Sequence, residues 1–194
     1  MNITIRLATE ADLSTIVQWR QDATAWLVSI GSDQWSGAGI DVIAFTTRVR
    51  ISIAEGGTWI AEVEGQPAAT VAIDDHCDDP ELWTPAEQAE SVIVHRMMAD
   101  QAHRRRGLGA VLLDHADWIA RQYGKRWVRL DAWTTNTRLH DYYRQLGFRL
   151  VRVSDPTWVS AALFERPVST DQQPSDSVVK ELVVGQMMAK NVSS

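Results

Sequence analysis

The segment from His103 to Leu113, which reads HRRRGLGAVLL, places the strongest constraint on how this chain folds. It follows the β-branched run Ser91–Val94 and precedes a long amphipathic stretch, which predicts a strand, a basic glycine loop and then a helix. Glycine lets backbone amides approach a ligand closely, and the first turn of a helix leaves N–H groups without partners. The helix dipole contributes about 0.3–1 kcal/mol toward a nearby anion. The segment therefore predicts a cradle for a phosphate-bearing ligand.

Two widespread phosphate-binding patterns are missing from this loop. It has no Gly-x-x-x-x-Gly-Lys-Ser/Thr sequence, which a P-loop NTPase would carry. It also has no Gly-x-Gly-x-x-Gly sequence followed by a ribose-binding acid, which a dinucleotide site would carry. Nucleotide hydrolysis and dinucleotide binding are therefore disfavoured.

Two motifs together resemble those of the GNAT N-acetyltransferase superfamily. The run Arg104-Arg105-Arg106-Gly107-Leu108-Gly109 is similar to the acetyl-CoA loop of that family, Arg/Gln-x-x-Gly-x-Gly/Ala. The segment Asn136–Phe148 is similar to its Asn, six residues, Tyr, three residues, Gly-Phe segment, and the interval between the motifs fits one helix plus one strand. The resemblance covers roughly Ile3 to Arg166 and implies an α/β (α+β) fold, with a GNAT-like mixed central sheet flanked by helices.

Each motif also has a purely structural interpretation, which can hold together with the functional one. The basic loop can be a solvated helix start. The second segment can be a capped helix that ends at Gly147, in a backbone conformation suited to glycine, before a strand.

Length and charge limit the classes of function. A chain of 194 residues with 45% hydrophobic residues can bury one full core. The net charge of −6 argues against a general nucleic-acid surface. No run of about 18 apolar residues indicates a membrane span, and the first residues do not resemble a signal peptide. Cys77 is the single cysteine, so we expect no internal disulfide and a cytoplasmic location.

The pattern along the chain predicts one GNAT-like domain over residues 1–167 and a linker-like tail over 168–194. Within the tail, Val178–Ala189 can form a short helix that packs on the domain or on a second subunit of a homodimer, and a disordered tail is the equal alternative. The segment Thr9–Asp12 resembles a capping box, and 74–90 reads as a polar loop. We expect strands over 3–7, 58–63, 67–73, 91–98, 126–132, 148–153 and 158–166, of which 58–63 and 67–73 form a hairpin with its turn at Glu64–Gln66. We expect helices over 13–30, 41–55, 108–123 and 136–146, with strand character at 49–53 as the alternative within the second helix.

The family resemblance implies which residues hold acetyl-CoA as the co-substrate. The backbone of the strand before the loop matches the segment that pairs with the pantetheine arm, and the loop matches the segment whose amides surround the diphosphate. Asn136 matches a residue that often contacts the cofactor, and it can equally be a plain helix N-cap. The implied cofactor-binding residues are Met97, Met98, Ala99, Arg104, Arg105, Arg106, Gly107, Leu108, Gly109, Ala110, Asn136 and Tyr143.

The same resemblance implies the catalytic groups. Tyr143 matches the tyrosine that faces the thioester sulfur and can protonate the departing thiolate. Tyr142 lies about 100° away around the helix and is expected to face elsewhere. Asp131 is the first candidate for the base that deprotonates the amine, and His95 on the neighbouring strand is the alternative.

Two further groups of residues can have either a structural or a functional role. The run Asp74–Asp79 contains metal-ligand residue types, but contiguous ligands cannot all converge on one ion, so we expect a solvated acidic loop, no metal and no nucleophilic role for Cys77. As a rim the run can still attract a protonated amine. Five tryptophans can belong to the core or line an acceptor cleft: Trp26, Trp35, Trp59, Trp83 and Trp133.

The sequence thus predicts an acetyltransferase in which a bound primary amine attacks acetyl-CoA directly. A small cationic molecule or a peptide is the expected acceptor. One alternative is acylation of a macromolecule, either a protein N-terminus or an aminoacyl-tRNA, although an acidic protein is poorly suited to RNA. The other alternative is a non-catalytic acyl-CoA-binding regulatory module.

Overall fold

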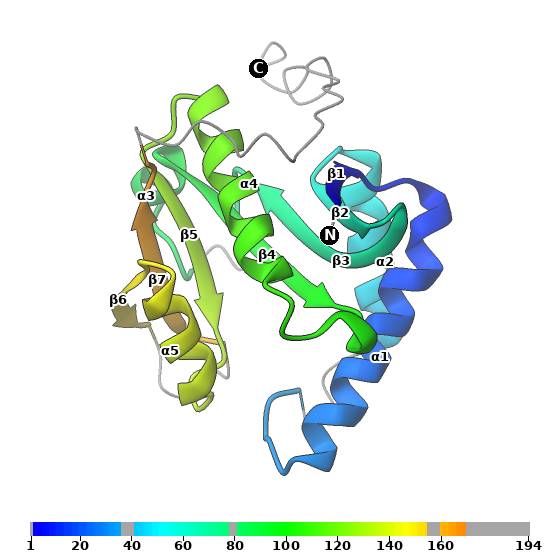
Figure 1. Cartoon of the computed structure of the whole chain (residues 1–194). Helices are drawn as coiled ribbons and strands as arrows, with labels where there is room; N and C mark the ends of the chain where they lie inside the picture. Colours follow the sequence, from blue (N-terminus) through cyan, green and yellow to red (C-terminus); the bar gives the residue numbers. More distant parts are fainter. Residues whose placement is uncertain (1, 36–40, 78–80, 155–159, 170–194) are drawn as a thin grey trace.

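A seven-stranded mixed sheet organises the computed structural model, which describes residues 2–35, 41–77, 81–154 and 160–169 (Figure 1). The strands are β1 (Ile3–Leu7), β2 (Thr58–Val63), β3 (Gln66–Asp74), β4 (Ser91–Ala99), β5 (Trp127–Ala132), β6 (Arg149–Val153) and β7 (Ala162–Pro167). The helices are α1 (Leu13–Ser29), α2 (Val42–Ala54), α3 (Pro85–Ala89), α4 (Leu108–Gln122) and α5 (Thr137–Gln145), with short 3₁₀ turns η1 (Glu10–Asp12) and η2 (Gln101–His103). The predicted fold class is confirmed.

One strand pair gives the sheet its mixed character. The strand order is β1-β2-β3-β4-β5-β7-β6, and within it β4 and β5 run parallel while the other neighbours are antiparallel. The parallel register runs from Ser91 opposite Trp127 to Val94 opposite Leu130, and both strands continue beyond it. Figure 1 shows β4 and β5 diverging toward their C-terminal ends. A gap therefore opens inside the sheet.

Helices cover both faces of the sheet. Alternation along β2 places Ala61 in the large core that α4 and α5 complete, and Ile60 in a second core that α1 and α2 complete. Side chains of β4 alternate in the same way. Val92 and Val94 belong to the α4 face, whereas Ile93 packs under Trp83 on the opposite face, which α1 and α2 share.

Local sequence signals account for most element boundaries. The turn residues Glu64 and Gly65 have φ values of +52° and +77°, as a tight two-residue hairpin requires, so the predicted hairpin is confirmed. Thr9 and Asp12 form the predicted capping box. The first helix ends at Ser29, close to the predicted end at 30, and residues 42–54 are helical rather than extended.

The prediction of a polar loop over 74–90 is wrong in part. Thr84 and Glu87 form a capping box that starts α3, with Pro85 at its first turn. Cys77 and Trp83 are buried because they pack against the sheet together with Leu82, Ile93 and Leu163. Tertiary packing, which the local pattern does not reveal, converts this segment into a third small core.

The end of the chain is described only as far as residue 169. The last strand begins at Ala162 rather than at the predicted residue 158, and 155–159 lie outside the described residues. The predicted helix at 178–189 also lies outside them. Within the described part of the chain, no helix has the length and apolar character needed to cross a membrane.

A buried ion pair fastens the strands beside the gap. Arg129 of β5 donates to Glu165 of β7 at 2.8 and 3.0 Å, and both side chains are almost fully enclosed. Arg129 also donates to the Glu87 carbonyl, and Arg149 of β6 pairs with the same Glu165 carboxylate. Breaking such a pair leaves a buried charge without compensation.

Replacing Glu165 with Ala should lower the free energy of unfolding by about 3–5 kcal/mol, because Arg129 stays buried without its counter-charge. Urea denaturation followed by circular dichroism measures this loss. The control Glu90→Ala removes the exposed partner of Arg126 and should cost at most about 1 kcal/mol. An equal, small effect of both substitutions would contradict the assigned role of the buried pair.

Candidate functional site

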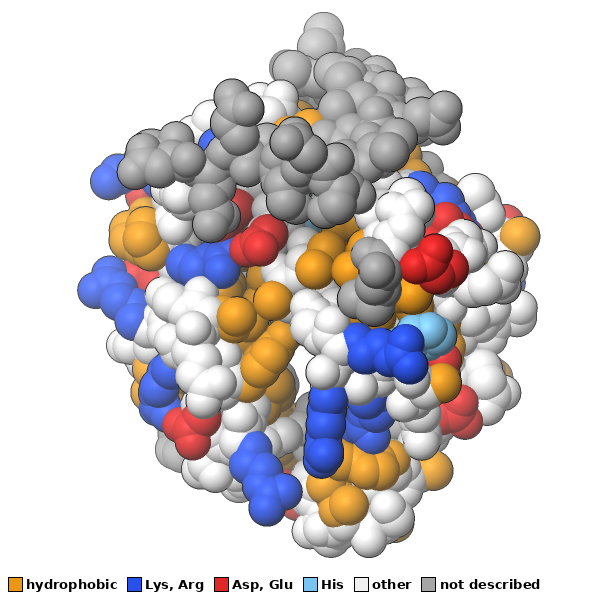
Figure 2. All heavy atoms as spheres, in the orientation of Figure 1, with side chains coloured by type: hydrophobic (Ala, Val, Ile, Leu, Met, Phe, Trp, Pro, Cys, Tyr) orange, Lys and Arg blue, Asp and Glu red, His pale blue; other side chains and the backbone are white. Residues whose placement is uncertain are grey.

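A pocket of about 1740 Å³ occupies the gap between β4 and β5. Its lining comes from α1, α2, the segment Val94–Ala99, the start of α4, the end of β5 and the start of α5. Figure 2 shows the cleft on the surface with basic side chains along its margin. The pocket is therefore built by elements from both faces of the sheet.

The basic glycine loop forms one end of this pocket. Gly107 precedes α4 with φ +78°, and Arg105 has φ +63°, so the chain turns sharply before the helix begins. Within the described residues, no hydrogen bond engages the N–H groups of Leu108, Gly109 and Ala110. A side chain at position 109 would collide with the Tyr142 hydroxyl. This helix start offers free amides in a positively charged setting.

Not every residue predicted for the anion cradle faces the pocket. Arg104 and Arg105 line it, and the Arg104 guanidinium lies 3.4 Å from the ring centroid of Trp26. Arg106 and Ala110 are not among the lining residues, which limits Ala110 to its backbone amide. The contact between Arg104 and Trp26 holds the loop against α1.

The end of β4 forms the floor of the pocket. Its pairing with β3 shifts register where Thr70 faces Met98 and Ala72 faces His95, and Arg96 adopts φ +49° at this bulge. Met97, Met98 and Ala99 line the pocket after pairing with β5 has ended, as the predicted backbone role requires. The edge of β4 that faces the gap is thus open to an extended ligand.

The connection after α1 closes the pocket on another side. Asn136 caps α5 by accepting from the Leu139 amide at 3.0 Å, and its amide nitrogen donates to Gln34 at 2.5 Å. Thr135 donates to the exposed carboxylate of Asp33 at 2.7 Å. The predicted N-cap is confirmed, and these bonds tie the α1 side of the pocket to the α5 side.

Tyr143 enters the site from the α4 face. It is buried among Phe148 and Phe164, each with its ring centroid 5.8 Å away. Burial, followed by the negative charge of Asp131, raises the pKa of Tyr143 well above its ordinary value of 10. The phenol therefore keeps its proton at neutral and moderately alkaline pH, as a proton donor must.

The two candidate bases lie together, with Cys77 beside them. Ligand-type atoms of Cys77, His95 and Asp131 lie within 4.8 Å of one another. Ser160 donates to Asp131 at 2.6 Å. His95 Nε2 is 3.0 Å from the His76 carbonyl, and since a carbonyl only accepts, Nε2 carries a hydrogen in this contact.

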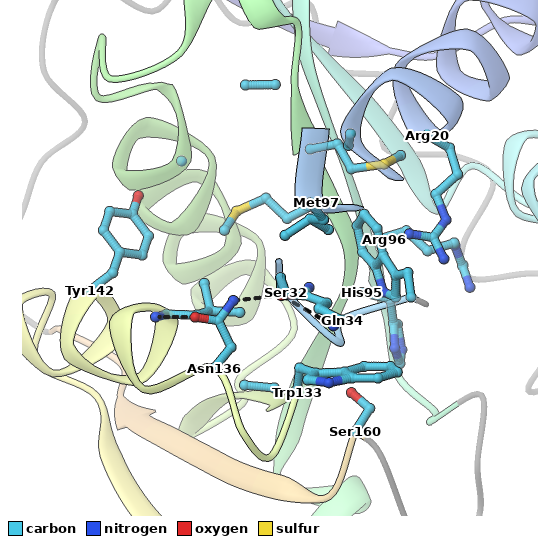
Figure 3. A pocket seen from close by; sticks show the side chains of 18 of the residues that line it. Arg20, Ser32, Gln34, His95, Arg96, Met97, Trp133, Asn136, Tyr142 and Ser160 are labelled. Carbon is cyan, nitrogen blue, oxygen red and sulfur yellow. Dashed lines mark hydrogen bonds between the residues drawn. The ribbon is translucent and has the colours of Figure 1, made fainter. Parts of the chain in front are cut away.

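Tyr143 and the two candidate bases approach the gap from opposite faces of the sheet. Tyr143 belongs to the core completed by α4 and α5. Alternation places His95 on the side of Ile93, which is the face of α1, α2 and Cys77. The charge of Asp131 contributes to the raised pKa of Tyr143, and both residues line the pocket. Figure 3 shows His95, Trp133 and Ser160 gathered in this pocket.

Several lining residues escaped the sequence analysis. Tyr142 was expected to face away from Tyr143, and its hydroxyl does lie beside Gly109. It nevertheless lines the pocket, because α5 borders the gap with two of its faces. The five tryptophans fall into the two predicted groups. Trp59 packs on His115 and Trp83 is fully buried, whereas the other three line the pocket, namely Trp26, Trp35 and Trp133. Arg20, Gln34, Cys77 and Ser160 carried no motif that could have found them.

Comparisons with known proteins show the family to which this chain is related. Residues 54–150, half of the chain, match the model of the acetyltransferase (GNAT) domain. The uncharacterized N-acetyltransferase YesJ of Bacillus subtilis (strain 168) is 28% identical over 150 residues, which cover 75% of this chain and 79% of YesJ.

Solved structures share the fold. A GNAT family acetyltransferase from Listeria monocytogenes 4b F2365 is similar with a TM-score of 0.69 and 24% identity, over 85% of this chain and 94% of the other. A structure of yncA from Salmonella typhimurium with its cofactor acetyl-CoA has a TM-score of 0.62 and 18% identity, over 91% and 99% of the two chains. At these identities the likeness concerns the fold.

Proposed function

The chain belongs to the GNAT acetyltransferase family, and on that premise we propose that it transfers an acetyl group from acetyl-CoA to the primary amine of a small molecule by direct attack. One observation carries the proposal. A proton donor, Tyr143, and a pair of bases, Asp131 and His95, border the same gap in the sheet from opposite faces. Such an arrangement suits a reaction in which one group loses a proton and another gains one.

The pocket has the groups needed to hold a thioester with a phosphate-bearing carrier. The free amides at the start of α4, together with Arg104 and Arg105, suit a diphosphate. The open edge of β4 at Met97–Ala99 suits the amide-containing arm that joins the phosphates to the sulfur. The sulfur would then lie between Tyr143 and Asp131.

The proposed reaction conserves protons and electron pairs. The acceptor arrives as an ammonium ion, which the carboxylate of Asp131 attracts, and it loses a proton to Asp131 or to Nδ1 of His95. The neutral amine attacks the thioester carbonyl carbon, a C–N bond forms, and the C–S bond breaks. The nitrogen of the adduct loses its second proton to the other base, while the sulfur leaves as a thiolate and takes the proton of the Tyr143 hydroxyl. Of the two protons that the nitrogen has lost, one returns to Tyr143 and the other passes to solvent, so the products are the acetamide, the free thiol and one proton. Holding both reactants in this geometry supplies a large part of the acceleration.

We assign the cluster of Cys77, His95 and Asp131 to proton transfer rather than to a metal. Ser160 already donates to Asp131, and the His76 carbonyl already orients His95. These contacts hold the two bases in place without an ion. The reaction needs no covalent enzyme intermediate, so Cys77 receives no nucleophilic role.

Two other functions fit the pocket less well. Aminoacyl-tRNA as acceptor would need a basic surface, but the chain carries a net charge of −6. A protein N-terminus remains an acceptor that the same chemistry serves. A non-catalytic acyl-CoA-binding module would have no use for a buried phenol facing a base cluster.

Replacing Arg105 with Ala should weaken coenzyme A binding by about 10-fold, because a charge-assisted contact to phosphate is lost. Isothermal titration calorimetry measures the dissociation constant. The control Arg126→Ala removes an exposed arginine paired with Glu90 outside the pocket and should leave binding unchanged. Absence of coenzyme A binding by the unaltered protein, even at millimolar concentration, would overturn the proposed function.

Replacing Tyr143 with Phe should lower kcat by about 10²–10⁴-fold while leaving coenzyme A affinity unchanged, since only the proton donor is removed. A thiol-release assay across a panel of amines measures kcat. Because the pKa of Tyr143 is raised, the unaltered protein should show no loss of rate between pH 8 and about 10 from this group. The control Tyr123→Phe alters a tyrosine outside the pocket; an equal effect of both variants would contradict the role of Tyr143.

Replacing Asp131 with Asn should lower kcat/KM by about 10²–10⁴-fold, and His95→Asn combined with it should lower it further, because the two bases share one task. The control Asp141→Asn alters an exposed aspartate paired with Arg144. Treatment with a chelator should not change the rate. Loss of activity on chelation, restored by zinc, would instead identify the cluster as a metal centre.

A further inference from the structure

Arg20 of α1 is a buried cation without a counter-charge. Only 8% of its surface is exposed, and it lines the large pocket. Within the described residues its guanidinium has no hydrogen-bond acceptor and no carboxylate partner, and Nη1 is fully enclosed. Burial alone lowers the pKa of Arg20 to about 10, so the group still carries its charge at neutral pH.

Aromatic rings hold this guanidinium in place. Its central carbon lies 3.3 Å from the ring centroid of Trp35 and 5.6 Å from that of Phe45. Trp35 adopts φ +64°, an uncommon conformation for a residue of this size. Stacking covers the flat face of a guanidinium and leaves its in-plane N–H groups for hydrogen bonds. Figure 3 shows Arg20 directed into the pocket.

Arg20 lies on the side of the pocket where the base cluster lies. Its helix neighbours Ile16 and Trp19 belong to the core completed by α1 and α2, on the same face of the sheet as His95. The cradle at the start of α4 belongs to the opposite face. Arg20 therefore stands on the amine side of the reaction rather than beside the diphosphate.

The charges in the pocket leave Arg20 unmatched. Among the described residues, six arginines and three aspartates line the pocket. The aspartates are engaged, because Asp33 accepts from Thr135, Asp41 accepts from the Ile43 amide, and Asp131 accepts from Ser160. An unpaired buried cation is costly to the folded protein, so a ligand that brings its own anion is the natural partner.

We propose that Arg20 binds a carboxylate of the acceptor, so that the substrate is an amino acid or a similar zwitterion that bears both the reacting amine and an anionic group. This proposal rests on the proposed function and names its substrate class. The planar fork of a guanidinium matches a carboxylate with two parallel hydrogen bonds. Asp131 then attracts the ammonium end and Arg20 the carboxylate end, which orients the amine toward the thioester.

The test compares matched acceptors that differ only at the anionic group. For α-, β- and γ-amino acids, each compound is assayed beside its carboxamide and its decarboxylated amine, with thiol release as the readout. The unaltered protein should favour at least one carboxylate by about 100-fold in kcat/KM over its neutral partners, because those leave Arg20 unpaired.

The variant Arg20→Gln should lower kcat/KM for that carboxylate by about 100-fold and change the rate on the carboxamide by less than about threefold. Arg20→Lys should recover part of the loss, since the charge returns without the fork. The control Arg50→Gln alters an exposed arginine of α2 that pairs with Glu10 outside the pocket and should change neither. The melting temperature of Arg20→Gln should equal or exceed that of the unaltered protein, which separates a binding defect from misfolding.

Other outcomes overturn the proposal in distinguishable ways. Equal rates on all three members of every set, or an equal loss on all of them in Arg20→Gln, would remove the carboxylate role. Weaker coenzyme A binding by Arg20→Gln would assign Arg20 to the carrier instead. If no amine is acetylated and no coenzyme A binds, the proposed function itself fails. If coenzyme A binds without turnover, amino acids should still raise the melting temperature of the complex, but not that of Arg20→Gln; no difference would refute the proposal.

Discussion

The structure depends on the place where two parallel strands stop pairing. β4 and β5 share hydrogen bonds from Ser91 to Val94 and then diverge, although both continue. On one side β4 stays paired with β3 on both sides of the bulge at Arg96, and on the other the buried pair of Arg129 and Glu165 joins β5 to β7. The gap is thus held open by the rest of the sheet, and the pocket forms within it.

A gap inside a sheet is reached from both of its faces, and this determines how chemistry is arranged there. Tyr143 comes from the face covered by α4 and α5, and His95 comes from the face covered by α1 and α2. A ligand in the gap would therefore meet Tyr143 from one face and His95 from the other. Backbone strain is also concentrated at the pocket. Four described non-glycine residues have positive φ, and three of them line the pocket, namely Trp35, Arg96 and Arg105.

Sequence reasoning succeeded where a local rule decides the outcome. The hairpin turn at Glu64-Gly65, the capping box at Thr9 and the N-cap Asn136 each depend on residues within a few positions, and all three are present. It failed at 74–90, where Trp83 packs against strands far along the chain. Within the candidate site, the motifs indicated Tyr143 and the glycine loop, but the isolated residues Cys77, Ser160 and Arg20 have no spacing that marks them.

The sequence by itself determined the family, the fold class and the glycine loop that starts α4, because these follow from short motifs and from periodicity. Only the tertiary structure decided which side chains share a pocket and which charges remain without partners. The physical reason is that burial and electrostatic pairing are properties of neighbours in space. Arg20 is an ordinary helix residue in the sequence, and it becomes a buried, unmatched cation only when Trp35 and Phe45 fold over it.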